Sequence, residues 1–335
     1  MNFVKNAWYV AGWASEFDHS LKALTILDKN IVMYRSHLGE LVALDDCCPH
    51  KLLPLSKGRL TEDQIVCGYH GMTFGKNGLC TRIPGQKNIP PNAKVHAYPI
   101  YEHHNIVWIW MGDSEKARST KLFDLPQFTD SNWASHQGGA LHLKCNYLSV
   151  AENLVDPAHV SWVHPTTLGS AASEDIPVDF DITGDNIIAW RWIRNSPPVG
   201  FFQQYGNFNG NVDRWHYYYL HLPCIAVIDF GSVDTALALP ADRRHEGCQI
   251  YALHFMTPVS RDYTIDRWMH IRNTAINDEA VSLKMDEMFK VAFDEDKAIL
   301  EEIQIQEQKE ESRPTLRLAI DKGSHIYRKR INRLI

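Results

Sequence analysis

The stretch CPHKLLPLSKGRLTEDQIVCGYH (residues 48–70) decides the architecture of the first part of this chain. It begins with C-P-H and ends with C-G-Y-H, so each end pairs one thiol with one imidazole. Two cysteines and two histidines on two short loops match the ligands of a [2Fe–2S] cluster in which the cysteines bind one iron and the histidines bind the other. The stretch therefore predicts a cluster held by Cys48, His50, Cys67 and His70, in a protein that transfers electrons.

A zinc site is the alternative for the same four side chains. Structural zinc sites usually pair like ligands, as C-x2–4-C and H-x3–5-H, whereas each loop here mixes a cysteine with a histidine. Pro49 stiffens the first loop, and Gly68 and Gly71 allow main-chain amides to approach the sulfur atoms of the second. A cluster of the Rieske type, with two neutral imidazole ligands, is therefore favoured over zinc.

The composition argues against several classes of protein. The 335 residues are enough for two domains with buried cores. The 34 basic and 40 acidic residues give a formal charge of −6, which argues against nucleic acid or an anionic membrane as partner. We expect no signal peptide, because no basic region precedes an apolar core, and no run is long enough for a transmembrane helix. Seven cysteines, an odd number, do not fit a secreted disulfide framework, so we expect a cytoplasmic protein.

Strand patterns and turn residues divide the chain into two predicted domains, residues 1–115 and 116–335. The first is expected to be all-β, because short β-rich runs alternate with Gly, Asn and Asp. The second is expected to be one broad antiparallel sheet with helices on one face, which makes the chain α+β. Its predicted elements are strands at 186–193, 214–230, 248–258 and 263–273 and a long helix at 277–311, ahead of Pro314.

A second possible metal site lies in NLVDPAHVSWVH (residues 153–164), which contains two histidines five positions apart. On an ideal helix such positions lie about 140° apart and cannot bind one ion together. Pro165 disfavours helical geometry at the preceding residue, so His164 can leave the helix and approach His159. Asp156, three residues before His159, can accept a hydrogen bond from the other ring nitrogen of a ligand histidine. Taken alone, the pair is equally compatible with histidines that bind no metal.

A carboxylate from AFDEDKAILEEI (residues 292–303) would complete this site. Two histidines and one carboxylate form the facial triad of non-haem Fe(II) oxygenases. At helical spacing Asp296 shares an apolar stripe with Phe293, whereas Asp294 and Glu295 have charged neighbours. A carboxylate inside an apolar stripe is costly to bury unless a partner such as a metal pairs with it. Asp296 is therefore the predicted third ligand, with Asp294 as the alternative.

Together these motifs resemble the oxygenase components of Rieske non-haem iron oxygenases along the whole chain, and most closely the vanillate and dicamba O-demethylase branch. The resemblance implies an N-terminal Rieske domain and a helix-grip (START-like) catalytic domain with a large antiparallel sheet and a long C-terminal helix. The matching stretches are NAWYVA (6–11), CPHKLLPLS (48–56), CGYHG (67–71), WIWMGD (108–113), CNYLSVAENLVDPAHVSWVH (145–164) and EDKAILE (295–301).

The resemblance also implies roles for individual residues. The implied ligands are Cys48, His50, Cys67 and His70 for the cluster, and His159, His164 and Asp296 for a mononuclear Fe(II). Asp156 is implied to link a cluster histidine of one subunit to an iron histidine of the next, in a homotrimer. The implied substrate-binding residues are Asn153, His254 and Glu287. Two positions depart from the family pattern, because Lys51 replaces its usual arginine and Glu287 replaces a pocket aromatic of one close relative.

The reaction follows from the same resemblance. The sequence has no GxGxxG after a strand and no P-loop, so electrons are expected from a separate NAD(P)H-dependent reductase or ferredoxin. With O2, the enzyme would hydroxylate a small aromatic substrate, most simply by O-demethylation of a methoxylated aromatic acid. Ring hydroxylation and N-demethylation on the same scaffold are alternatives, and so is a Rieske electron carrier with a non-catalytic second domain. The basic tail HIYRKRINR (325–333) is expected to be a solvated chain end, with docking of an acidic electron donor as the alternative.

Overall fold

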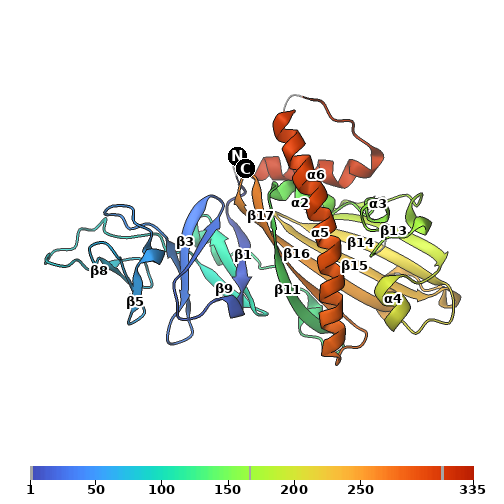
Figure 1. The fold of residues 1–335 in the computed structure, drawn as a ribbon, viewed down its shortest axis with the longest axis horizontal. Helices are drawn as coiled ribbons and strands as arrows, with labels where there is room; N and C mark the ends of the chain where they lie inside the picture. Colours follow the sequence, from blue (N-terminus) through green and yellow to red (C-terminus); the bar gives the residue numbers. More distant parts are fainter. Residues whose placement is uncertain (1–2, 166, 311–312) are drawn as a thin grey trace. The chain divides into compact units, whose positions relative to one another are not determined.

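The computed structural model describes residues 3–165, 167–310 and 313–335. The chain divides into two compact units. Unit 1 runs to Leu122 and also contains Thr257–Arg261, whereas unit 2 comprises Phe123–Met256 and Asp262–Ile335. Unit 1 is built of strands with a few short helical turns, and unit 2 combines one large sheet with helices (Figure 1). The predicted α+β organisation is confirmed.

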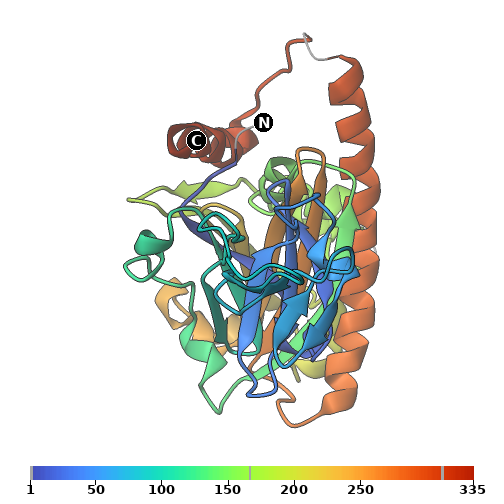
Figure 2. The same cartoon turned by 90° about the vertical axis from the view of Figure 1, so that its left-hand side faces the viewer.

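Unit 1 contains three small antiparallel sheets joined by long loops (Figure 2). Its core includes Val32, Leu44 and Phe74 together with Cys48 and Cys67, so both cysteines predicted as cluster ligands lie in the hydrophobic interior. The strand orders are β1 (Ala7–Trp13), β10 (Ile106–Met111), β9 (Ile100–His103); β2 (Lys22–Ile26), β3 (Lys29–Arg35), β4 (Leu41–Asp45); and β5 (Arg59–Thr61), β6 (Gln64–Val66), β7 (Thr73–Phe74), β8 (Cys80–Arg82). The short helical turns are η1 (Ala14–Glu16), η2 (Leu55–Lys57) and α1 (Ser114–Ala117).

Unit 2 is organised around a seven-stranded antiparallel sheet. Its strand order is β11 (Ala134–Leu143), β17 (Tyr263–Arg272), β16 (Cys248–Ser260), β15 (Ile225–Asp234), β14 (Val212–His221), β13 (Ile187–Ser196), β12 (Asp179–Asp181). The prediction of a single strand over 214–230 is wrong, because β14 and β15 form a hairpin in which His221 pairs with Ile225. Pro223, which lies in the turn, has no N–H and cannot continue a strand ladder.

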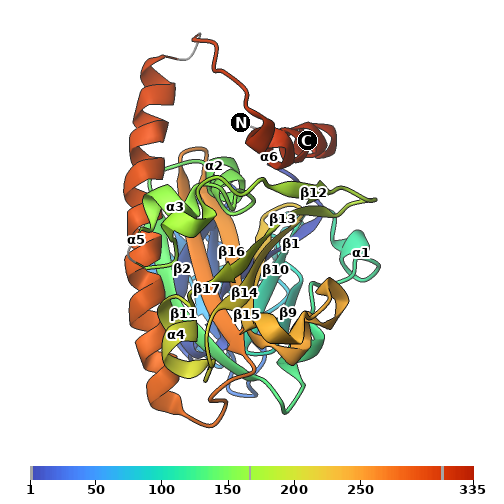
Figure 3. The same ribbon diagram turned by 90° about the vertical axis from the view of Figure 1, so that its right-hand side faces the viewer.

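Helix α5 (Glu279–Lys309) lies across one face of this sheet (Figures 1 and 3), which confirms the predicted long helix. The side chain of Asp278 caps its N-terminus by accepting hydrogen bonds from the N–H groups of Ala280 and Val281. Its buried stripe includes Met285, Phe289, Ala292, Phe293, Asp296 and Leu300. Burial of each large apolar side chain contributes about 1.5–3 kcal/mol. Packing of this stripe therefore fixes which residues of α5 face the sheet.

Shorter helices complete unit 2. They are α2 (Tyr147–Asn153), α3 (Val160–Val163) and α4 (Gly200–Tyr205), with the 3₁₀ turns η3 (Pro126–Phe128), η4 (Ala171–Ser173), η5 (Thr235–Leu237), η6 (Ala241–Glu246) and η7 (Ala319–Asp321). In the described ranges, every helix is too short or too polar to cross a lipid bilayer.

The basic C-terminal segment forms helix α6 (Lys322–Leu334), so the expectation of a solvated chain end is wrong. Tyr327 and Ile331, four residues apart on one face, are buried. The Tyr327 hydroxyl donates to the carbonyl of Pro223 at 2.8 Å, and Arg328 Nη2 pairs with the Glu152 carboxylate at 2.8 Å. This amphipathic helix packs against α2. It was not predicted because charged residues lie between Tyr327 and Ile331.

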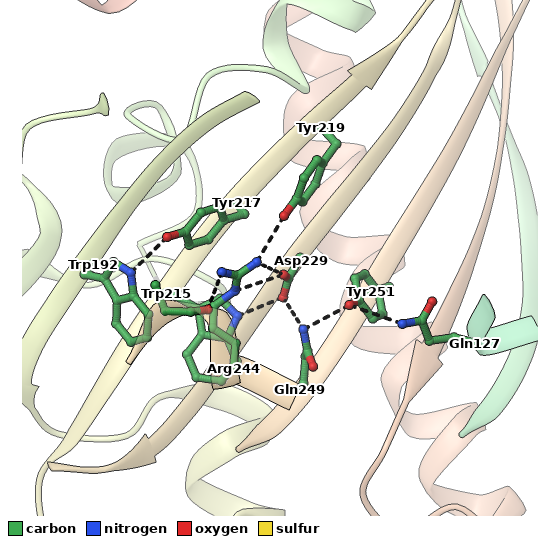
Figure 4. A network of polar contacts seen from close by, with 10 residues as sticks. Gln127, Trp192, Trp215, Tyr217, Tyr219, Asp229, Arg244, Gln249 and Tyr251 are labelled. Atoms are coloured by element: carbon green, nitrogen blue, oxygen red, sulfur yellow. Dashed lines mark hydrogen bonds and ion pairs between the residues drawn. The ribbon is translucent and has the colours of Figure 1, made fainter. Parts of the chain in front are cut away.

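A polar network occupies the sheet face opposite to α5 (Figure 4). Asp229 lies at its centre: Oδ1 accepts hydrogen bonds from Trp215 Nε1 at 2.8 Å and Gln249 Nε2 at 2.7 Å, and Oδ2 accepts one from Arg244 Nη2 at 3.0 Å. Burial raises the pKa of Asp229, and the Arg244 guanidinium opposes this effect. Because the carboxylate is fully partnered, the network anchors η6 to the sheet and has a structural role.

Candidate cluster site and metal centre

The two Cys/His loops of unit 1 share one main-chain pattern. The Cys48 N–H donates to the carbonyl five residues later at 2.9 Å, and its carbonyl accepts from the N–H four residues later at 3.0 Å. Cys67 makes the same two bonds, at 2.8 Å and 3.1 Å. The fourth residue after each cysteine has a positive φ, 61° at Leu52 and 71° at Gly71. Two loops of the same shape are suited to present equivalent ligands to one cluster.

Within each loop the thiol is buried and the imidazole is exposed. Cys48 and Cys67 are 2% and 3% exposed, whereas His50 and His70 lie at the surface with ring centroids 4.7 Å apart. Burial raises the pKa of the Cys48 thiol, and main-chain N–H groups of His50 and Lys51 act in the opposite direction. Such N–H groups stabilise a sulfur ligand. The donor set fits a [2Fe–2S] cluster whose imidazole side faces outward.

In unit 2 the structure brings His159, His164 and Asp296 together. Their ligand atoms lie within 4.8 Å of one another, and Asp296 Oδ1 is 3.1 Å from His164 Nε2 and 3.5 Å from His159 Nε2. His164 ends α3 with φ −117° and ψ 49°, outside the helical region, as expected for the residue before Pro165. Two imidazole nitrogens and one carboxylate oxygen around one point are a donor set that suits non-haem iron.

Further side chains hold these three residues in place. His164 Nδ1 lies 2.7 Å from Glu295 Oε2, and the Asn153 amide donates to Asp296 Oδ1 at 3.0 Å. His159 Nδ1 lies 2.5 Å from the main-chain carbonyl of Asp156. The expected contact of the Asp156 carboxylate with His159 is therefore replaced by a main-chain contact, because that carboxylate instead accepts the Ala158 N–H at 2.8 Å.

The charges of the triad support one another. Burial alone would raise the pKa of Asp296, but hydrogen bonding and charge from the two histidines outweigh this effect and lower the pKa. Burial alone would lower the pKa of His164, but Asp296 and Glu295 outweigh this effect and raise the pKa. Asp294, the alternative ligand, pairs with Lys290 at 2.7 Å on the exposed side of α5. Asp296 is thus the carboxylate of this helix that is placed to bind a cation beside both histidines.

A cavity opens beside the triad, between α5 and the sheet. It encloses about 800 Å³ of space that no atom fills, a figure that includes open solvent. Its walls are mostly apolar, and the described lining residues include Leu154, Val160, Leu168, Phe201, Phe202, Ile228, Phe230, Ala252, Met288, Phe289 and Phe293. This apolar and aromatic lining suits a small, largely apolar molecule.

Polar side chains of the sheet also line the cavity, among them Arg214, His216 and His254. His254 Nδ1 lies 2.7 Å from Asp266 Oδ2, so Nε2 is the ring nitrogen available to a bound molecule. His216 Nδ1 is buried and lacks a hydrogen-bond partner among the described residues. Arg214 donates to two serine hydroxyls, and burial lowers its pKa to about 10, so it remains a cation near neutral pH.

The structure places the residues predicted to bind substrate in different environments. His254 lines the cavity, whereas Asn153 bonds to Asp296 and is not among the lining residues. Glu287 is exposed, so its prediction as a pocket residue is wrong. The next two positions, Met288 and Phe289, line the cavity instead, because each step along a helix turns by about 100°. Arg214 was not predicted from the sequence. The available signal was its position in β14, where it and Trp215 and Tyr217 point to opposite faces of the sheet.

Comparison with known proteins identifies both halves of the chain. Residues 7–99 match the model of the Rieske [2Fe-2S] domain, and residues 143–335 match that of the vanillate O-demethylase oxygenase C-terminal domain. The chain is 34% identical to the iron–sulfur subunit of the toluene-4-sulfonate monooxygenase system of Comamonas testosteroni, over 99% of this chain and 97% of the relative. It is 30% identical to a vanillate O-demethylase oxygenase subunit of a Pseudomonas species, over 99% and 95%.

A solved structure is similar over the same length. Dicamba monooxygenase bound to 3,6-dichlorosalicylic acid superposes with a TM-score of 0.89 at 26% identity, over 100% of this chain and 98% of that one. A further structure of that enzyme contains non-haem iron and dicamba. The cofactors of the present chain are accordingly a Rieske [2Fe–2S] cluster and a mononuclear iron.

Proposed function

The chain belongs to the Rieske non-haem iron oxygenases, and we propose that it oxidises a methoxy or methyl carbon of a small aromatic acid. It is the oxygenase component of a multicomponent monooxygenase, which receives electrons from a separate reductase or ferredoxin. O-demethylation of a methoxylated aromatic acid is the reaction we place first.

The environment of Arg214 supports the proposal that the substrate is an acid. Arg214 is 2% exposed and lines the cavity, yet among the described residues its guanidinium bonds only to the hydroxyls of Ser196 (3.1 Å) and Ser170 (2.8 Å). No acidic residue of the described ranges pairs with it. Burying an unpaired charge is costly. A carboxylate or sulfonate of the substrate would supply the missing anion and orient the ring in the cavity.

The proposed reaction consumes one O2, two electrons and two protons for each methoxy group. One oxygen atom enters the methyl carbon and the other leaves as water, after which the hemiacetal collapses to a phenol and formaldehyde. When bound, the cluster delivers electrons and the mononuclear iron activates O2. In this proposal Arg214 holds the anionic end of the substrate, His254 Nε2 contacts its polar substituent, and the apolar wall excludes water.

Hydroxylation of a methyl group on an aromatic sulfonate is a second candidate. The relatives named for toluene-4-sulfonate favour it, since one of them shares 34% identity over nearly the full chain. A sulfonate would satisfy Arg214 as a carboxylate does. The two candidates differ in product, because only O-demethylation releases formaldehyde.

The proposal also assigns roles to the ligand residues and to the assembly. Cys48, His50, Cys67 and His70 would hold the cluster, and His159, His164 and Asp296 the mononuclear iron. Asp156 would link the two sites between neighbouring subunits of a homotrimer. Only its Oδ1 has a hydrogen-bond donor among the described residues, which supports a role for Oδ2 toward another subunit. A cytoplasmic location is supported by seven cysteines that form no disulfide.

The test compares charged and neutral substrates with a surrogate reductase. We expect the wild type to release formaldehyde from 4-methoxybenzoate and not from its methyl ester, and toluene-4-sulfonate to give an alcohol if the second candidate holds. Arg214→Met should raise the KM for the turned-over acid about thirty-fold or more, since loss of a buried charged partner costs about 2 kcal/mol or more.

Arg194→Met is the matched control. Arg194 lies on the neighbouring strand β13, pairs with Asp213 at 2.8 Å and is half exposed, so its loss should leave KM unchanged. Equal turnover of the acid and its ester by the wild type would contradict the role of the anion.

A further inference from the structure

A second group of two histidines and one carboxylate lies in unit 2, apart from the iron triad. His136 on β11, His270 on β17 and Asp286 on α5 have ligand atoms within 4.8 Å of one another. The two histidines are paired across the strands, with ring centroids 5.2 Å apart, and His136 Nε2 is 3.9 Å from Asp286 Oδ1. Three separate elements of the fold therefore converge on one point.

His270 has an unusual environment for a buried polar side chain. It is fully buried, and neither of its ring nitrogens makes a hydrogen bond of normal geometry to the described residues, although the main chain of Ser282 lies near the ring. Asp286 Oδ1 is buried without a partner as well. Unpartnered buried polar atoms are rare in folded proteins, and each carries a desolvation penalty. A cation between these atoms would satisfy all of them.

The charge states suit a metal ligand set. Burial lowers the pKa of His270 to about 3, with His136 and Arg272 acting in the same direction and the main chain of Ser282 opposing, so the imidazole is neutral and has a free lone pair. Arg272, whose charge acts on His270, donates instead to Ser282 Oγ at 2.8 Å and to the carbonyl of Asp278 at 2.8 Å.

A histidine–carboxylate ion pair alone does not account for this geometry. The 3.9 Å between His136 and Asp286 is too long for a hydrogen bond. Even a shorter contact between these two residues would leave both nitrogens of His270 without a partner.

We propose that His136, His270 and Asp286 form a second divalent-metal site, which takes zinc. Two imidazoles and a carboxylate are ligands that Zn²⁺ binds in tetrahedral geometry, with water in the fourth position. The ion ties α5 to the paired strands β11 and β17. It also lies behind the cavity wall, since the His270 ring centroid is 5.7 Å from that of Phe289. The site is structural and holds the first half of α5 in position.

Metal content of the intact oxygenase tests the proposal. The untagged protein, loaded with its cluster and mononuclear iron, is dialysed against micromolar Zn²⁺, and zinc and iron are measured together by mass spectrometry. We expect one zinc per chain with no loss of iron, and a higher thermal unfolding midpoint in zinc.

Variants locate the bound zinc. His136 is partly exposed, so His136→Ala should fold, lose the bound zinc and bind Zn²⁺ about a hundred-fold more weakly, because loss of a supporting group outside the ligand set already costs ten- to a hundred-fold. Asp286→Asn should weaken binding as well. His142→Ala is the matched control, because His142 lies on the same strand and contacts the Tyr263 hydroxyl at 3.0 Å instead.

The possible outcomes separate the alternatives. Three results would overturn the proposal. The wild type could bind no zinc, or His136→Ala could bind zinc as tightly as the wild type. Zinc could also bind only as iron is lost. The last of these results would show exchange at the triad of His159, His164 and Asp296. Failure of the proposed reaction would leave the zinc measurement unaffected, because it does not depend on turnover.

Discussion

Replacing Glu295 should weaken iron binding although Glu295 is not a proposed ligand. Its carboxylate oxygen lies 2.7 Å from His164 Nδ1, so it orients the ring and makes Nε2 a stronger donor. Loss of such a partner typically costs ten- to a hundred-fold in metal affinity. Glu295→Gln still accepts a hydrogen bond, and the carboxylate is 31% exposed, which partly screens its charge. We therefore expect about a ten-fold loss for glutamine and about a hundred-fold loss for Glu295→Ala.

The assay is competition for Fe(II) with a chelator of known affinity, with the cluster absorbance as a check on unit 1. Asp294→Asn is the control, because Asp294 is the adjacent carboxylate of α5, pairs with Lys290 on the exposed side and should have no effect. Iron affinity of Glu295→Ala equal to that of the wild type would show that Glu295 does not support His164 as a ligand. Equal losses in Glu295→Ala and Asp294→Asn would show that only the local charge matters.

Three further predictions concern the metal centre and pH. His159→Ala should retain the visible and EPR signals of the cluster but lose turnover, and retained activity would rule out His159 as a ligand. Asp156→Asn should bind both cofactors yet slow electron transfer between them, which single-turnover kinetics would detect; an unchanged rate would exclude the bridge. Burial lowers the pKa of His270 to about 3, so below pH 6.5 the unfolded chain takes up a proton that the folded chain does not. Stability should therefore fall from pH 6.5 toward pH 3, by up to about 1.4 kcal/mol per unit. The unfolding midpoint of His270→Gln should drop less than that of the wild type between pH 7.5 and 5.5 in metal-free buffer, and equal drops would contradict the assignment.

Helical periodicity was sufficient to select Asp296 from the acidic residues of α5. Asp296 is the acid that shares a stripe with Phe289 and Phe293, and the structure buries all three. The same rule could not find Glu295, because its role depends on a histidine more than a hundred residues away and its neighbours in the helix are charged. It also could not reveal that His159 contacts a main-chain carbonyl, since every residue has one.

The sheet was harder to predict from the sequence. In β14, Arg214 and His216 face the cavity while their neighbours face the network around Asp229, so an alternation of large polar and aromatic side chains hides two different surfaces. The His136–His270 pair depends on the register of β11 with β17, which only the folded sheet defines. Helix α6 was missed because its two large buried side chains, Tyr327 and Ile331, are surrounded by basic residues.

Helix α5 has a consequence for how substrate preference can diversify. Phe289 and Phe293 form part of the cavity wall, and Asp296 follows one turn later, roughly 4.5 Å along the same rigid element. A substitution that enlarges the cavity from this side is liable to shift Asp296 as well. Changes at Ile228 or Ala252 on the sheet carry no such penalty. In laboratory evolution of this enzyme toward new substrates, we therefore expect tolerated mutations to lie on β15 and β16, with α5 nearly invariant.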